Sequence, residues 1–247
     1  MIESTKEILM EFLRMRLGNS QQVFDKFRAL PNAIHEQGSC SEQFLYIRGA
    51  RTNKVLLVAH ADTYWDQHGV HPSDDPHTVE DDKEHGKLVS SQRGLGADDR
   101  AGCAILWLLR NSGHSLLITD GEEYGQKGSK WLRDCYPGHY DEINTIHQFV
   151  IEFDRKNARD FKCYKVGTPE FGKYIEKKTK FCENNDCGKT DIGILCKNIC
   201  GVNLSIGYQN EHYADEHLTL ADWEHTLNLT CKWLEHEDLP RFKRPHS

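Results

Sequence analysis

The sequence lacks the long apolar runs and the leader signals that accompany membrane proteins and secreted proteins. No segment approaches the roughly 18 consecutive apolar residues that would span a bilayer. The first residues, MIESTKEILMEFLRMRLG, lack the basic stretch, the uninterrupted apolar run and the small-residue cleavage site of a secretory signal. We therefore expect a cytoplasmic protein.

The chain also lacks an excess of positive charge, internal repeats and linkers rich in proline, glycine or serine. Its formal net charge is -7, and lysines and arginines are scattered among acids, so nucleic-acid phosphates would not attract it. With 38% hydrophobic and 28% charged residues, the composition is typical of a soluble globular protein with a substantial core. The absence of repeats and linkers predicts one domain over residues 1–247.

Nine cysteines are present, and five of them fall close together: Cys163, Cys182, Cys187, Cys196 and Cys200. Such a group could form a small zinc knot or a disulfide pair. Its spacings, however, are not the paired two-residue knuckles of a structural zinc site. We interpret these residues as small buried hydrophobic side chains.

Apolar periodicity predicts an α/β fold. Residues 4–17 form an opening helix behind Ser4, with Glu7 placed for a capping box, and residues 219–236 form a closing helix behind Thr219. Between them, helical stretches such as 102–113 and 128–136 alternate with five apolar runs typical of strands. These runs are QFLYIRG (43–49), KVLLVAHAD (54–62), SLLITDGEE (115–123), HQFVIEFD (147–154) and GVNLSIGY (201–208). The alternation predicts a single-domain, mixed but mostly parallel sheet with helices on both faces, a three-layer sandwich.

Residues 64–93 depart from this pattern. They contain four histidines, His68, His71, His77 and His85, and many acids, but little apolar periodicity. The histidines could be metal ligands, but we interpret the segment as a long, solvated surface connection beside the site that the strand ends build.

Carboxylates and imidazoles follow four of the predicted strands: His60 with Asp62, Glu122 with Glu123, Asp154, and His212. A fifth segment, GLGADDRAG, places Asp98 and Asp99 at the start of a helix. Because the carboxyl ends of strands in an open α/β sheet line one crevice, we expect these groups to converge. Two histidines with several carboxylates suit Zn²⁺, Mn²⁺ or Co²⁺, and a bridging carboxylate can hold two such ions about 3.5 to 4 Å apart. The pattern therefore predicts a site for two divalent metal ions.

The order of HAD, HGKLVSSQRGLGADDRAG, TDGEEYGQKGS, IEFD and NEHYADEHL, across residues 54–218, resembles the co-catalytic dizinc exopeptidase clan. That clan includes peptidase T, the aminoacylase and carboxypeptidase relatives, and the single-domain leucyl-type aminopeptidases. The resemblance implies two ions, most simply zinc, bound by the residues His60, Asp98, Glu123, Asp154 and His212.

The resemblance also implies a role for each residue. Asp98 would bridge the two ions, with His60 and Asp154 completing one coordination shell and Glu123 and His212 the other. Glu122 would be the general base, on the expectation that consecutive side chains leave an extended backbone in opposite directions. Asp62 would accept from the second ring nitrogen of His60 and fix its tautomer. Asp99 would be structural.

One departure from peptidase T and the aminoacylases concerns their lid or dimerisation domain, which is inserted between the positions of Asp154 and His212. Only 57 residues intervene here, so we expect no inserted domain, and a single-domain aminopeptidase is the better comparison. Within this interval, Asp191 of GKTDIGIL would either help to hold a substrate amine or cap a helix or turn.

We therefore predict a dimetal hydrolase of peptide bonds, an aminopeptidase acting on short peptides through a metal-activated water. The alternative enzyme is a carboxypeptidase or an N-acyl amino acid amidohydrolase, in which Arg155 or Arg159 would bind a substrate carboxylate. The alternative from another class is an inactive binding module of the same fold, although all seven site residues are present. The expected partner is a small peptide or acylamino-acid substrate, with neither nucleic acid nor membrane, and the oligomeric state is left open.

Overall fold

Helices and strands alternate along the chain in the computed structural model, which describes residues 4–66, 77–90, 94–184 and 186–244. The helices are α1 (Thr5–Leu13), α2 (Gln21–Arg28), α3 (Ala97–Leu108), α4 (Lys127–Cys135), α5 (Pro137–Ile146), α6 (Pro169–Thr179), α7 (Ile192–Leu195) and α8 (Leu220–Leu234), with a short 3-10 helix, η1, at Tyr64–Asp66. Within the described ranges no helix has both the length and the apolar character needed to cross a bilayer.

Eight strands form the main sheet, in the order β1-β2-β6-β3-β7-β10-β8-β9. Their bounds are β1 (Ala33–Gln37), β2 (Gln43–Ile47), β3 (Leu56–His60), β6 (Ser115–Thr119), β7 (Val150–Arg155), β8 (Asp160–Lys162), β9 (Cys182–Glu183) and β10 (Gly201–Ser205). The central strands β6, β3, β7 and β10 are parallel, whereas β2 and β8 run antiparallel to their central neighbours. The mixed, mostly parallel sheet and all five predicted strands are thereby confirmed, while β1, β8 and β9 are additions to the prediction.

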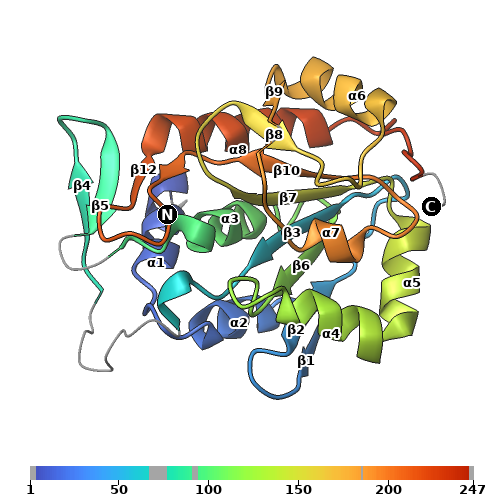
Figure 1. Ribbon diagram of the computed structural model, residues 1–247, viewed down its shortest axis with the longest axis horizontal. Coiled ribbons are helices and arrows are strands. Elements are labelled where there is room, and N and C mark those ends of the chain that lie inside the picture. Colours follow the sequence, from blue (N-terminus) through green and yellow to red (C-terminus); the bar gives the residue numbers. More distant parts are fainter. Residues whose placement is uncertain (1–3, 67–76, 91–93, 185, 245–247) are drawn as a thin grey trace.

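The helices cover both faces of the main sheet, as the three-layer prediction requires (Figure 1). Successive side chains of a strand point to opposite faces, so Leu57 and Ala59 of β3 join the apolar cluster formed with α1, α3 and α8. Leu56 and Val58 of the same strand join a second cluster with α4, α5 and α7. A strand buried on both faces explains why residues 55–59 form one continuous apolar run.

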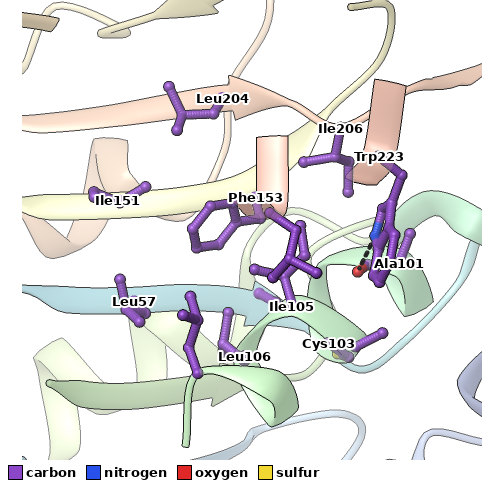
Figure 2. Close-up of a cluster of buried hydrophobic side chains, with 14 of the residues drawn as sticks. Leu57, Ala101, Cys103, Ile105, Leu106, Ile151, Phe153, Leu204, Ile206 and Trp223 are labelled. Atoms are coloured by element: carbon purple, nitrogen blue, oxygen red, sulfur yellow. Dashed lines mark hydrogen bonds between the residues drawn. The ribbon is translucent and has the colours of Figure 1, made fainter. Parts of the chain in front are cut away.

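Helix α3 is held tightly against the central strands (Figure 2). Its Ile105 and Leu106 are fully buried in the same cluster as Phe153 of β7. Trp223 of α8, also fully buried, donates its indole N–H to the carbonyl of Ala101 at 3.1 Å. The first turn of α3, which carries Asp98 and Asp99, is therefore fixed by packing from both α8 and the sheet.

A second, smaller sheet lies beside the main one. Its order is β11-β12-β5-β4 and all of its pairs are antiparallel; the strands are β4 (Val79–Asp82), β5 (Lys87–Ser90), β11 (Tyr208–Gln209) and β12 (His217–Thr219). Figure 1 shows the β4–β5 hairpin extending from the main body next to β12. Leu88 of β5 is fully buried and is paired in register with Leu218 of β12.

The prediction of a solvated connection over residues 64–93 is therefore wrong for its second part. The hairpin strands are only four residues long, and β4 has the sequence VEDD. The alternation of apolar and polar residues is therefore too short to be recognised from the sequence. His77 is buried and contacts the carbonyl of Leu95 at 3.1 Å, whereas His85 is exposed and pairs with Asp82 at 2.8 Å. His68 and His71 lie outside the described residues.

The two predicted helix caps have different outcomes. Ser4 accepts from the Glu7 backbone and Glu7 reaches back to the Ser4 N–H, so the capping box of α1 is confirmed. Thr219 occupies the N-cap position of α8, but its side chain makes no cap hydrogen bond.

The cysteines are free thiols. Cys163, Cys196 and Cys200 are buried, as the interpretation of small hydrophobic side chains expects, but Cys182 and Cys187 are exposed and depart from it.

Candidate metal centre

The predicted site residues gather at the carboxyl ends of the central strands. His60 is the last residue of β3, and Asp154 lies near the end of the neighbouring strand β7. The ring Nε2 of His60 faces two carboxylate oxygens, Oδ1 of Asp98 at 3.1 Å and Oδ1 of Asp154 at 3.3 Å. One buried imidazole nitrogen is therefore shared between two acids.

A second imidazole completes the other side of the centre. His212 Nε2 lies 2.8 Å from Glu123 Oε1 and 3.3 Å from Asp98 Oδ2. Its ring stacks on Tyr64, with centroids 4.5 Å apart and planes 12° apart, and this contact fixes the direction of the imidazole. Asp98 thus presents one carboxylate oxygen to each histidine.

The donor separations fit a pair of metal ions. Ligand atoms on one tetrahedral ion with bonds of about 2.0 to 2.1 Å are separated by about 3.3 to 3.4 Å. Three of the imidazole–carboxylate distances, at 3.1, 3.3 and 3.3 Å, lie near that value, whereas 2.8 Å between His212 and Glu123 is a hydrogen-bond distance. Among the described residues, His60, Asp98 and Glu123 bring one potential ligand atom each within 4.8 Å of one another.

Asp98 is held in place through its backbone. Glu216, 2% exposed, accepts from the Gly96 N–H at 2.6 Å through one oxygen and from the Asp98 N–H at 3.1 Å through the other. Gly96 has φ +69°, a left-handed conformation that glycine adopts without strain. The peptide bond between Asp98 and Asp99 is cis. Glu216 is not among the predicted site residues, although it stands four residues after His212 in the same motif.

Asp99 has the structural role that the resemblance implies. Its Oδ2 accepts from the His60 backbone N–H at 3.1 Å and its Oδ1 from the Gly102 N–H at 3.0 Å. It could join His60 and Asp154 in a group of potential ligands, but both of its oxygens already serve backbone donors. Asp99 therefore joins the end of β3 to the first turn of α3.

Asp62 lies beside His60, but its contacts differ in part from the expectation. The nearest acceptor for His60 Nδ1 is the backbone carbonyl of Asp62 at 3.1 Å, and the carboxylate Oδ1 is 3.4 Å away. The two carboxylate oxygens accept from the backbone N–H groups of Glu122 and Glu123, each at 3.2 Å. Asp62 thus orients the imidazole mainly through its main chain and positions the glutamate pair through its side chain.

Glu122 and Glu123 point to different partners, as the two assigned roles require. Glu123 meets His212, while Glu122 accepts from the Gln126 side-chain amide at 3.2 Å. The reason given for their separation was wrong, because they lie in a turn after β6 and not on extended backbone. The Gln126 N–H closes that turn on the Glu122 carbonyl at 3.0 Å.

Two further residues support Asp154 and were missed from the sequence. Thr190 donates to Asp154 Oδ2 at 2.9 Å, and Tyr208 donates to Oδ1 at 3.3 Å. Thr190 stands beside Asp191 in GKTDIGIL, and Tyr208 ends the fifth predicted strand run. Both segments are recognisable in the sequence, but the contacts of these two residues with Asp154 are not. Hydrogen bonds to the outer side of a ligand fix its orientation and are a regular feature of metal sites.

His212 reaches the centre by a route that differs from the prediction. Strand β10 ends at Ser205, and Gly207, with φ +95°, turns the chain into β11 of the small sheet. His212 lies in the connection between β11 and β12, itself at φ +68°. The second imidazole therefore comes from the small sheet and not from the end of a main-sheet strand.

Burial and mutual charge shift the ionisation of these groups. Burial raises the pKa of Glu123 to about 7 and that of Asp154 to about 6. Burial opposes the charged form of His212, but hydrogen bonds to Asp98 and Glu123 raise the pKa of the imidazole to about 11. Burial, followed by the Asp154 carboxylate, raises the pKa of Glu122 well above its ordinary range. So many acids in one buried site favour added positive charge, which divalent cations would supply.

Two candidate substrate-binding residues are engaged elsewhere. Asp191, 1% exposed, accepts from Ser129 at 2.6 Å and from the Thr119 hydroxyl, so it anchors α7 to β6 and α4, and its side chain caps no helix. Arg155, 4% exposed, forms ion pairs of 2.7 Å with Asp160 and 2.8 Å with Asp186. These contacts leave neither side chain available to a substrate. Arg159 is exposed on the connection between β7 and β8.

Solved structures of peptidases share this architecture. An aminopeptidase PepT from Bacillus cereus ATCC 10987 superposes with a TM-score of 0.69 at 14% identity, covering 94% of this chain and 98% of that one. This chain has the zinc-exopeptidase fold. A tripeptidase from Staphylococcus aureus subsp. aureus Mu50 gives 0.66 at 13% identity, covering 95% and 99% of the two chains.

A TET aminopeptidase from the marine sediment archaeon Thaumarchaeota archaeon SCGC AB-539-E09 gives a TM-score of 0.64 at 11% identity, with 95% of this chain and 97% of that chain covered. In sequence comparisons, no protein-family model and no curated protein matches this chain. At these identities the structural likeness establishes the fold, and the chemistry has to be argued from the site itself.

Proposed function

We propose that the protein is a dimetal-dependent aminopeptidase that removes the N-terminal residue from short peptides. The observation that carries the proposal is the position of Asp98 between two imidazoles, with Oδ1 3.1 Å from His60 and Oδ2 3.3 Å from His212. A carboxylate shared in this way, with one further acid on each side, is the donor set of a two-ion site. Two of the solved structures that share the fold are of aminopeptidases, which agrees with this choice.

The ligands of the two ions would be His60 and Asp154 on one side, Glu123 and His212 on the other, and Asp98 between them. A mixed set of imidazole nitrogens and carboxylate oxygens suits Zn²⁺, with Mn²⁺ or Co²⁺ as alternatives. When bound, two such ions would supply Lewis acidity and lower the pKa of a water molecule from 15.7 toward about 7.

Glu122 would act as the general base. It is the acid of the centre that faces neither histidine, so its oxygens are available to take a proton from water and return it to the leaving amine. Its largely buried position favours proton uptake, and Gln126 holds one of its oxygens in place. Asp62 would hold Glu122 and Glu123 in position by accepting hydrogen bonds from their backbone N–H groups.

The alternative enzymes are less well supported. Arg155, one of the two arginines expected to bind the substrate carboxylate of an acylase or carboxypeptidase, is committed to Asp160 and Asp186. An inactive binding module would tolerate loss of the base or of a ligand, whereas all seven residues are present and each contacts another member, Glu122 through its backbone N–H. We further propose one catalytic domain without an inserted lid, located in the cytoplasm.

The test combines metal content with a substrate panel. The protein would be loaded with Zn²⁺, Mn²⁺ or Co²⁺, its bound metal counted, and its hydrolysis of aminoacyl anilides, dipeptides and N-acyl amino acids compared. We expect two ions per chain and release of the N-terminal residue. Hydrolysis of N-acyl amino acids alone would replace the proposal by the acylase alternative, and two bound ions without any hydrolysis would favour a binding module.

A further inference from the structure

A cavity of about 660 Å³ lies beside the Asp154 side of the candidate metal centre. It is bounded by the turn after β8 and by the segment that leads into α7. Two of its lining residues contact the centre directly, since Gln126 donates to Glu122 and Thr190 donates to Asp154. A group bound in this cavity would therefore lie next to the bond that the centre would cleave.

The charged side chains of the cavity are unevenly matched. Its lysines are Lys162, Lys165 and Lys189, and its acids are Glu183 and Asp186. Lys162 pairs with Asp186 at 2.7 Å, and Arg155 pairs with the same acid at 2.8 Å. Burial disfavours the charged form of Asp186, but hydrogen bonds from Arg155 and Lys162 lower the pKa of this acid to about 2. Asp186 is thus neutralised by two cations that cannot serve a ligand.

Lys165 and Lys189 differ from Lys162 in having no acidic partner among the described residues. Both are exposed, and within the part of the chain that the structure describes neither forms an ion pair or a side-chain hydrogen bond. The one remaining acid, Glu183, lies near the Cys163 thiol, whose pKa is raised by burial and by this carboxylate. The described part of the cavity thus has two ammonium groups and one carboxylate that form no ion pair. This excess of positive charge would attract an anion.

The backbone at Lys165 is held in an unusual conformation. Tyr164 and Lys165 have φ of +45° and +64°, and the Val166 N–H closes the turn on the Cys163 carbonyl at 2.8 Å. Turns with two successive positive φ values normally carry asparagine or glycine, because larger side chains are strained there. The chain instead places a tyrosine and a lysine at these positions, and both side chains line the cavity. Strain of this kind is concentrated at functional sites.

We propose that this cavity binds a carboxylate of the peptide substrate through Lys165 and Lys189 and gives the enzyme a preference for carboxylate-bearing short peptides. The inference rests on the proposed peptidase function. It assigns to two lysines the role that the sequence had offered to Arg155, which is buried and paired. The carboxylate could belong to an acidic side chain or to the free C-terminus of a dipeptide, and both present the same charge.

Two pairs of matched substrates separate these sources. Glutamyl p-nitroanilide against glutaminyl p-nitroanilide tests a side-chain carboxylate, because the two differ only in that charge. Alanyl-alanine against alanyl-alanine amide tests a terminal carboxylate in the same way. Each pair is measured with the zinc-loaded wild type, Lys165→Gln, Lys189→Gln and the double variant. Lys177→Gln, on the exposed side of α6 and outside the cavity, is the charge-matched control.

The expected result is a wild-type preference, in kcat/KM, for the charged member of one pair. Each single variant should reduce that preference up to about fivefold, the typical range for a partly exposed charge pair, and the double variant should nearly abolish it. If the lysine substitutions abolish the preference within the glutamyl and glutaminyl pair, the cavity binds a side-chain carboxylate. If they abolish it within the alanyl-alanine pair, the cavity binds a terminal carboxylate. The inference is overturned if the double variant and Lys177→Gln leave both preferences equally unchanged.

A binding measurement keeps this outcome separate from failure of the proposed function. Calorimetric titration of glutamyl-glycine and glutaminyl-glycine amide into Glu122→Gln, with and without the two lysine substitutions, needs no turnover. Weaker binding of the charged peptide alone upon lysine substitution supports the carboxylate site even if the wild type hydrolyses no peptide. Unchanged affinities for both peptides overturn the site even if the wild type is an active aminopeptidase.

Discussion

The buried carboxylate of Glu216 accepts a hydrogen bond from the backbone N–H of Asp98 at 3.1 Å. The other oxygen of the same carboxylate accepts from Gly96 at 2.6 Å, so one buried side chain fixes both ends of the segment that enters α3. Asp98 is the residue that faces both imidazoles, and a small rotation of its backbone would move both carboxylate oxygens together.

We expect Glu216→Gln to weaken the binding of both metal ions by about 10- to 100-fold, the range for loss of an outer-shell partner. Glutamine keeps one acceptor but turns an NH₂ group toward a backbone N–H, so one of the two hydrogen bonds is lost. Competition with a chromophoric chelator measures the affinities. Glu235→Gln, on the exposed end of α8, is the control and should bind both ions as the wild type does. Loss of only one ion would show that Glu216 does not act through Asp98.

Glu122→Gln and Glu123→Gln should have different effects although the residues are adjacent. The Glu122 variant cannot accept a proton, and removal of a general base typically costs about 10² to 10⁴ in rate, while both ions stay bound. The Glu123 variant should lose affinity for one ion, because a neutral amide is a poor ligand for a dication. Steady-state kinetics and metal analysis of the same preparations give both readouts. Loss of an ion from the Glu122 variant with both retained by the Glu123 variant would exchange the two roles.

Gly102→Ala should destabilise the fold beside the centre. An added Cβ would lie 2.3 Å from the Phe153 carbonyl and 2.3 Å from Asp99 Oδ1, closer than such atoms approach. Forcing a methyl group into a packed site typically costs about 1 to 3 kcal/mol. Thermal unfolding of the metal-free protein measures the loss. Gly138→Ala, in α5 with open space around the added Cβ, should unfold at the wild-type temperature or above it. Equal midpoints for the two variants would contradict the close contact.

His147 should contribute to acid sensitivity. Burial lowers the pKa of this imidazole to about 3, below the value near 6.5 of an unfolded chain. Its ring contacts the Ile143 carbonyl at 2.9 Å and the Ser115 hydroxyl at 2.7 Å, which suits the neutral form. The unfolded state therefore binds the extra proton, and the stability due to a neutral His147 is complete above about pH 6.5 and is lost as the pH falls toward 3.

The expected effect is a loss of about 2 kcal/mol of unfolding free energy between pH 7 and pH 5 in the wild type beyond that in His147→Gln. Urea unfolding at several pH values, with His236→Gln as an exposed control, measures the difference. Parallel pH profiles for wild type and His147→Gln would mean that the imidazole is not kept neutral by the fold.

The parts of the fold that the sequence predicts are those with long, uniform patterns. Strand β3 is recognisable because it is buried on both faces, and α1 because its capping box and apolar spacing agree. Convergence of His60 and Asp154 follows from parallel strands whose carboxyl ends share one edge. Asp62, Glu122 and Glu123 follow β3 and β6 at the same edge of the sheet. The roles of the seven site residues were predicted from the resemblance to known exopeptidases.

The parts that escape prediction depend on contacts between distant segments. The β4–β5 hairpin owes its order to pairing with β12, which is more than a hundred residues away, and its own four-residue strands carry little signal. Thr190 and Tyr208 are ordinary polar residues until the fold brings them to Asp154. The contact of Glu122 and Glu123 with different partners comes from a turn whose shape depends on Asp62, sixty residues earlier.

The two histidines of the centre belong to different sheets, His60 to the main sheet and His212 to the link between β11 and β12. Ions held between them would act as a removable cross-link that fastens the small sheet to the body of the protein. Backbone amides of β5 and β12 should then exchange with solvent deuterium more slowly once metal is added, while those of the fully buried β3 change little. Deuterium exchange of the small sheet would therefore report how much metal the protein has bound, without the need for a substrate.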